Sequence, residues 1–117
     1  MRLFGFNKTT TDSNSKGVMK VCAYQISSAL TKLEKIPRNT WATDPQAMYY
    51  AAIIKNEVEK IQKLLVINGR TDWTLLNSTQ VETFDGEIID LSLFVDRLNN
   101  ENVVFEHYGL GSIRIWY

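Results

Sequence analysis

The sequence predicts an α+β domain, in which an antiparallel helical hairpin is followed by a β-hairpin, a short helix and a C-terminal β-hairpin. Three observations support this prediction. Apolar residues recur every three or four positions through residues 17–68, a spacing typical of helices. From residue 70 onward the period changes to two, which is typical of strands. The length of 117 residues suits one domain that buries a core of its own.

The first helix is expected over residues 17–36. Ser15 or Asn14 can cap its start, and Pro37 ends it because proline disfavours the α conformation in the residue before it. Its apolar stripe consists of Met19, Cys22, Ile26, Ala29, Leu33 and Ile36.

The second helix is expected from residue 45 to about residue 68. Asp44 suits the N-cap and Pro45 the first helical position, where the missing N–H costs nothing. Asn68-Gly69 is interpreted as the C-terminal stop. The short link between the two helices predicts that they pack antiparallel. The apolar stripe of the second helix consists of Ala47, Ala51, Ile54, Val58, Ile61 and Leu65.

Residues 73–84 alternate and are rich in Thr and Val, which predicts a strand. Asp85-Gly86 follows and predicts a hairpin turn. Asp90 is the expected N-cap of a third helix over residues 91–99, which Asn99-Asn100 ends. The stripe of this helix consists of Leu91, Phe94, Val95 and Leu98.

A second hairpin is expected over residues 102–108 and 112–117, around Gly109-Leu110-Gly111. The register that best separates the two faces puts Val103, Phe105, Ile113 and Ile115 on the core side and Glu106, Tyr108, Arg114 and Trp116 on the outer side. Its last strand has an uncovered edge, so we expect a symmetry mate, a partner or the N-terminal arm to cover it.

Residues 1–16 are expected to form an N-terminal arm ahead of a single domain over residues 17–117. Residues 7–16 are polar and turn-prone and have nothing to bury. Phe4 and Phe6 precede that stretch, and we expect them to dock into an apolar site on the core or on another subunit.

The net charge of zero hides an asymmetry between the halves of the chain. Residues 1–64 contain ten Lys and Arg against five Asp and Glu, a net charge of +5, and residues 65–117 contain three against eight, a net charge of −5. Such a chain can attract copies of itself head to tail. The zero sum disfavours strong nonspecific nucleic-acid binding.

The residues of the sequence give little indication of a catalytic site. His107 and Cys22 are the only residues of their types, so no metal site can be built from several histidines or cysteines. Cys22 lies on a buried stripe, which disfavours a Cys–His nucleophile. The turn accounts for Asp85 and the helix cap accounts for Asp90. We therefore expect no metal site formed by these two residues and Glu87. We therefore expect no enzyme activity, no cofactor and no metal.

The sequence instead suggests binding to a partner or ligand, because Arg, Trp and Tyr dominate interaction hot spots. The candidate interface or ligand-binding residues are Phe4, Phe6, Arg38, Trp41, Arg70, Trp73, Tyr108, Arg114 and Trp116. The first hypothesis is a non-enzymatic structural or interaction subunit of a larger assembly, for example a virus particle, whose partners are copies of itself or other assembly proteins.

Two alternatives remain open. One is a small soluble oligomer that inhibits an enzyme or sequesters a ligand such as a nucleotide, because arginine and aromatic side chains suit phosphate pairing and base stacking. The other is a winged-helix-like DNA-binding protein, because a short helix and a hairpin are expected to end the chain.

We expect a cytoplasmic protein with no membrane partner. The longest apolar run, Ala47 to Ile54, is far shorter than the ~20 residues of a membrane helix. The start of the chain has no apolar core of the kind found in signal peptides.

Overall fold

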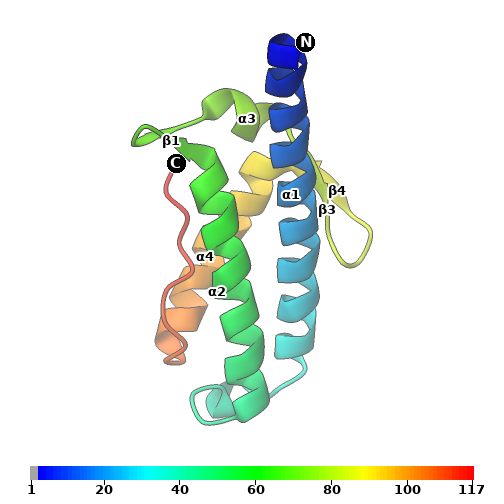
Figure 1. Cartoon of the computed structure of the whole chain (residues 1–117). Helices are drawn as coiled ribbons and strands as arrows, with labels where there is room; N and C mark the ends of the chain where they lie inside the picture. Colours follow the sequence, from blue (N-terminus) through cyan, green and yellow to red (C-terminus); the bar gives the residue numbers. More distant parts are fainter. Residues whose placement is uncertain (1–2) are drawn as a thin grey trace.

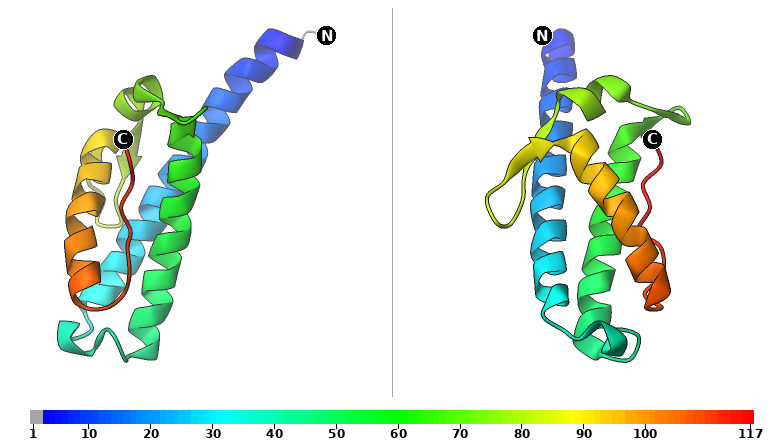
Figure 2. Two further views of the ribbon diagram at one scale, coloured as in Figure 1. Left: turned by 90° about the vertical axis from the view of Figure 1, so that its left-hand side faces the viewer. Right: turned by 180° about the vertical axis from the view of Figure 1, so that it is seen from behind.

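Three helices of the chain form two layers, as Figures 1 and 2 show. A computed structural model describes the backbone of residues 3–117 and the side chains of residues 14–117. Helices α1 (Leu3–Glu34) and α2 (Pro45–Leu65) lie antiparallel in one layer, and α4 (Leu91–His107) lies in the other. The short elements are η1 (Arg38–Thr40), β1 (Val66–Ile67), β2 (Arg70–Thr71), α3 (Trp73–Ser78), β3 (Gln80–Glu82) and β4 (Ile88–Asp90).

The α+β class is confirmed, because the helices are accompanied by two small antiparallel sheets. Strand β1 pairs with β2, and β3 pairs with β4 with Val81 opposite Ile89. The two hairpins are separate sheets and do not join into one.

The helical hairpin forms as its two stripes predict. All six stripe residues of α2 are buried, as are five of the six on α1, and Ile36 is partly buried against the same core. Asp44 caps α2 through its Oδ1, which accepts hydrogen bonds from the backbone N–H groups of Gln46 at 2.8 Å and Ala47 at 3.2 Å. The core therefore lies mainly where α1 and α2 face each other and α4.

The predicted start of the first helix is wrong, because α1 begins at Leu3 rather than at residue 17 and ends at Glu34. Once a helix is nucleated, each further residue adds one hydrogen bond, and no proline interrupts residues 3–16. The end of α1 therefore projects beyond the rest of the fold (Figure 2), and the longest extent of the molecule is 56 Å. The side chains of Phe4 and Phe6, with their expected docking, lie outside those that the structure describes.

The end of the second helix also differs from the prediction. Helix α2 stops at Leu65, and Asn68-Gly69 is the turn of the β1–β2 hairpin rather than a helix stop. Both residues have positive φ, 53° and 75°, as a two-residue hairpin turn requires.

The strand predicted over residues 73–84 is largely wrong. Its first half is the helix α3, which Asp72 caps by accepting a hydrogen bond from the backbone N–H of Leu75 at 3.0 Å. The turn at Asp85-Gly86 is confirmed, although only Gly86 has positive φ, 91°. The turn closes on a hydrogen bond from the N–H of Thr83 to the carbonyl of Glu87 at 2.8 Å, so three residues form the loop.

The prediction of a C-terminal β-hairpin is wrong. Helix α4 continues to His107, because its buried stripe extends from Leu98 to Asn102 and Phe105 at helical spacing. Residues 108–117 then run back irregularly between α2 and α4, as Figure 2 shows. The expected alternation of buried and exposed side chains is found only in this segment, where Ile113 and Ile115 are buried. The winged-helix alternative loses the hairpin that would have been its wing.

Candidate interaction surfaces

Exposed aromatic rings gather where the C-terminal segment ends. Trp73 is 54% exposed and meets Tyr117 edge to face, with ring centroids 5.9 Å apart. Trp116 is 64% exposed, and the guanidinium of Arg114 lies 5.9 Å from its ring centroid. We call Trp73, Arg114, Trp116 and Tyr117 the C-terminal aromatic surface.

Local structure explains why these side chains face outward. Ile113 and Ile115 are buried, so the intervening Arg114 and the following Trp116 point away from the core. Trp73 occupies the first position of α3, which the cap at Asp72 fixes. Three of the predicted site residues, Trp73, Arg114 and Trp116, thus belong to one region of the surface.

Trp41 does not belong to this surface. Trp41 is fully buried, and its indole N–H donates to the carbonyl of Ile36 at 3.0 Å. Its ring packs edge to face on Phe105 at 6.1 Å and on Tyr108 at 5.5 Å. The structure therefore makes Trp41 a core residue, with no area of its own to offer to a ligand or partner.

The other two predicted arginines, Arg38 and Arg70, differ in what they contact. Arg38 covers the buried Trp41 ring, with its guanidinium 5.5 Å from the ring centroid, and is paired with Glu34 at 2.8 Å. Arg70 is exposed in β2 and makes no ion pair with any described side chain. Arg38 therefore supports the core, and Arg70 is a free surface charge.

A second apolar surface was not predicted. An open groove of about 470 Å³ runs between α1 and the β3–β4 hairpin, lined by Lys20, Val21, Tyr24, Gln80, Val81, Glu82 and Ile88. Val21 is 59% exposed and Ile88 is 66% exposed. We call this the α1–β4 groove. The available signal was Val21 and Tyr24, two large apolar residues of α1 that lie off its buried stripe.

The tip of the hairpin is held firmly beside this groove. Tyr24 and Phe84 meet edge to face with ring centroids 5.7 Å apart. The backbone N–H of Phe84 also donates to the Oγ of Ser27 at 2.7 Å. The groove is therefore built on fixed elements rather than on a free loop.

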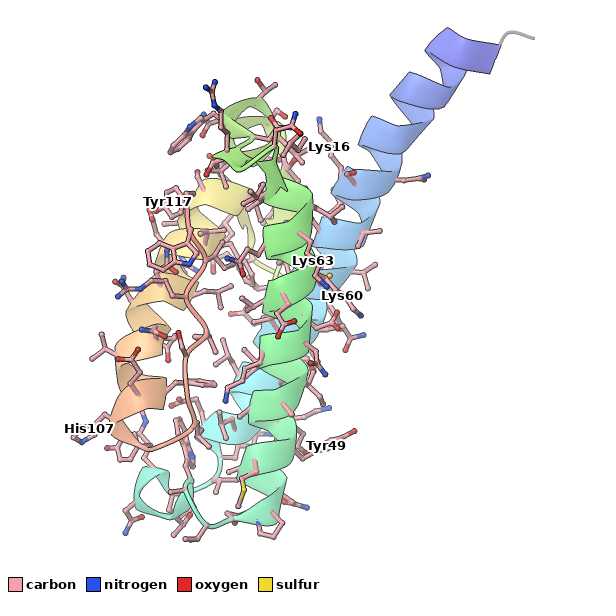
Figure 3. All side chains as sticks on the ribbon, turned by 60° about the vertical axis from the view of Figure 1, so that its left-hand side comes forward. Lys16, Tyr49, Lys60, Lys63, His107 and Tyr117 are labelled. Carbon is pink, nitrogen blue, oxygen red and sulfur yellow. The ribbon has the colours of Figure 1, made fainter. Side chains whose placement is uncertain are left out.

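The two apolar surfaces lie on opposite sides of the molecule. In Figure 1 the C-terminus lies beside α2 on the left, and β3 and β4 lie beyond α1 on the right. Charge differs along the sequence, since described residues 14–65 carry eight Lys and Arg against four Asp and Glu, whereas residues 66–117 carry three against eight. The β3–β4 hairpin beside the groove belongs to the acidic part, so both surfaces include charges of both signs. Figure 3 shows Lys16, Lys60 and Lys63 on the α1–α2 side and Tyr117 and His107 on the other.

Among the described residues, two titratable groups away from the surface have a raised pKa. Burial, aided by the nearby carboxylate of Glu57, raises the pKa of the Cys22 thiol to about 11, so this thiol stays protonated near neutral pH. Burial also raises the pKa of Glu101, and the negative charge of Glu34 adds to that effect. Within residues 14–117, no group of three or more His, Cys, Asp or Glu side chains could hold a metal ion.

None of the described helices has a stretch that is both long enough and apolar enough to cross a bilayer. The chain matches no family model, no curated protein sequence and no solved structure.

Proposed function

We propose that the protein is a non-enzymatic structural subunit that assembles head to tail, with the C-terminal aromatic surface of one copy bound in the α1–β4 groove of the next. The observation that carries this proposal is the pair of exposed apolar surfaces on opposite sides of the fold. Monomeric proteins rarely expose large contiguous apolar patches, and such patches commonly mark interaction sites.

The arrangement of the surfaces favours a heterologous contact over a symmetric one. A twofold dimer uses one patch against itself, whereas two different patches on opposite sides join copies into a ring or a filament. The groove offers a hollow lined by Val21, Tyr24 and Ile88. Trp116 projects outward on the other side and supplies the large flat ring that such a hollow suits.

Both surfaces carry charges that can pair across the contact. Lys20 and Glu82 line the groove. On the C-terminal aromatic surface, Arg114 lies beside Trp116 and Asp72 lies next to Trp73. Opposite charges on the approaching faces speed association and set its direction, and this effect weakens as salt rises.

A complementation experiment tests the proposal. Trp116→Ala removes the aromatic anchor, and Ile88→Asp places a charge at the mouth of the groove. At micromolar concentration, where the chain's own C-terminal segment stays bound in place, each variant alone is expected to be monomeric, because either change breaks every head-to-tail contact. An equimolar mixture is expected to form a dimer and to stop there, because each variant keeps the surface that the other lacks.

Light scattering after size-exclusion chromatography measures these masses. Val103→Ala is the matched control, because Val103 is 63% exposed on α4 and belongs to neither surface, so this variant is expected to assemble like the unmodified chain. Circular dichroism checks that every variant is folded. Folded variants that assemble like the unmodified chain, or a mixture that stays monomeric, contradict the proposal.

A further inference from the structure

Side-chain amides of α4, rather than a neighbouring strand, bind the backbone of the C-terminal segment. The side-chain amide of Asn99 binds both backbone groups of Ile115: its Nδ2 donates to the carbonyl at 3.0 Å, and its Oδ1 accepts from the N–H at 2.7 Å. This is the pair of hydrogen bonds that a neighbouring β-strand would supply. Within the described residues, no backbone–backbone hydrogen bond involves residues 111–117.

Asn102, one turn along α4, binds the backbone N–H of the segment but not its carbonyl. It is buried, and its Oδ1 accepts from the N–H of Ile113 at 2.9 Å and from the Oγ of Ser112 at 3.0 Å. Its Nδ2 donates to Glu106 at 2.8 Å, which fixes the orientation of the amide. Two amides on one face of α4 thus recognise two alternate residues of an extended chain.

Side-chain specificity comes from the alternate residues between them. Ile113 and Ile115 are almost completely buried, whereas Arg114 and Trp116 point outward. On the other side the segment borders α2, where a side chain at Gly111 would meet the ammonium group of Lys55. We call Asn99, Asn102 and the facing part of α2 around Lys55 the tail-binding surface.

The connection to the segment can change direction. Gly109 and Gly111 both have positive φ, 76° and 94°, values that glycine adopts without strain. Recognition through backbone hydrogen bonds and two isoleucine side chains does not depend on which chain supplies the segment. Exchange of an identical element between protomers needs only such a hinge.

We propose that the tail-binding surface is a binding site for an extended polypeptide, and that the C-terminal segment of a second copy binds there in place of the chain's own. This proposal does not rest on the α1–β4 groove. The two contacts use different residues, so each can fail without the other.

The test uses the full chain carrying Ile115→Ser, which weakens the hold on its own segment. The probe is a fluorescent peptide with the sequence of residues 110–115 followed by serine, so that no tryptophan is present to bind the α1–β4 groove. Fluorescence anisotropy is expected to show saturable binding to this variant. Binding to the unmodified chain should be at least about ten-fold weaker, because its own segment competes at an effective concentration in the millimolar range.

Two further variants assign the binding to the amides. Adding Asn99→Ala is expected to weaken peptide binding about ten-fold, as expected for the loss of two hydrogen bonds. Adding Asn100→Ala is the matched control, because Asn100 is an exposed asparagine of the same helix, and it should leave binding unchanged. Equal binding to the Ile115→Ser and unmodified chains, or no effect of Asn99→Ala, overturns the proposal.

If Ile115→Ser does not fold alone, the same titration is followed by circular dichroism. The peptide is then expected to restore the helical signal, because a ligand that binds only the folded state stabilises it. No recovery at millimolar peptide overturns the proposal.

Discussion

The backbone N–H of Phe84 donates a hydrogen bond to the hydroxyl oxygen of Ser27, at 2.7 Å and across 57 positions of the chain. This bond fastens the tip of the β3–β4 hairpin to α1. The hydroxyl of Ser27 also donates to the carbonyl of Tyr24, so its orientation is fixed within the helix. The hairpin is therefore docked by a helix residue that is polar and lies off the buried stripe.

Ser27→Ala is expected to destabilise the protein relative to Ser28→Ala by about 1 kcal/mol, the usual worth of one hydrogen bond. Both changes raise helix propensity by the same amount, so the comparison isolates the contact with Phe84. Urea denaturation gives the two free energies of unfolding. Equal values for the two variants would show that this bond contributes nothing to stability.

Trp41→Phe is expected to lower the free energy of unfolding by about 2–3 kcal/mol, because it leaves a cavity and deprives the Ile36 carbonyl of its donor. Trp116→Phe is the control and should change stability by less than about 0.5 kcal/mol, because Trp116 is exposed. Thermal and urea unfolding measure both. Similar losses for the two variants would contradict the assignment of Trp41 to the core and Trp116 to the surface.

The Cys22 thiol is expected to react with a disulfide reagent at pH 8 about a hundred-fold more slowly in the folded chain than in denaturant, because burial raises its pKa to about 11. Its contribution to stability is complete below its ordinary pKa of 9.0 and is lost as the pH rises through about 11. The Cys22→Ala variant should lack this part of the alkaline decline in the free energy of unfolding. A native rate equal to the denatured one would show that the thiol is accessible.

The carboxylate of Glu87 accepts two hydrogen bonds from Arg97, at 2.8 and 3.1 Å, and these lower its pKa. Arg97→Gln is expected to raise the pKa of Glu87 toward its ordinary value, which a carboxyl-carbon NMR titration measures. The pair stabilises the fold above that ordinary value, and the contribution is lost as the pH falls through the lowered pKa. Arg114→Gln is the control, and an equal shift in both variants would show that the ion pair is not the cause.

The helical hairpin could be predicted because its determinants are local. The stripes of α1 and α2 repeat at helical spacing, and Asp44-Pro45 is a strong start signal. Asn68-Gly69 is compatible with both a helix stop and a hairpin turn. It forms a turn here because Val66 pairs with Thr71 in a two-stranded sheet. That choice depends on the second strand and not on the dipeptide.

The C-terminal region could not be predicted because its determinants are tertiary. Asn99-Asn100 looks like a helix end, yet α4 continues, since the amides of Asn99 and Asn102 find their partners in residues 112–115. A buried asparagine is unfavourable on a helix until those partners are present. The candidate surfaces differ in the same way. The outward direction of Trp116 follows from local alternation and could be predicted. The α1–β4 groove could not, because it forms only when the β3–β4 hairpin docks on α1.

Sedimentation velocity of the unmodified chain over a range of concentrations is the most direct test of head-to-tail assembly. We expect species that grow beyond a dimer as concentration rises and that shrink toward the 13.5 kDa monomer as salt is added. A chain that stays at 13.5 kDa up to millimolar concentration at low salt, or that stops at a dimer, would contradict it.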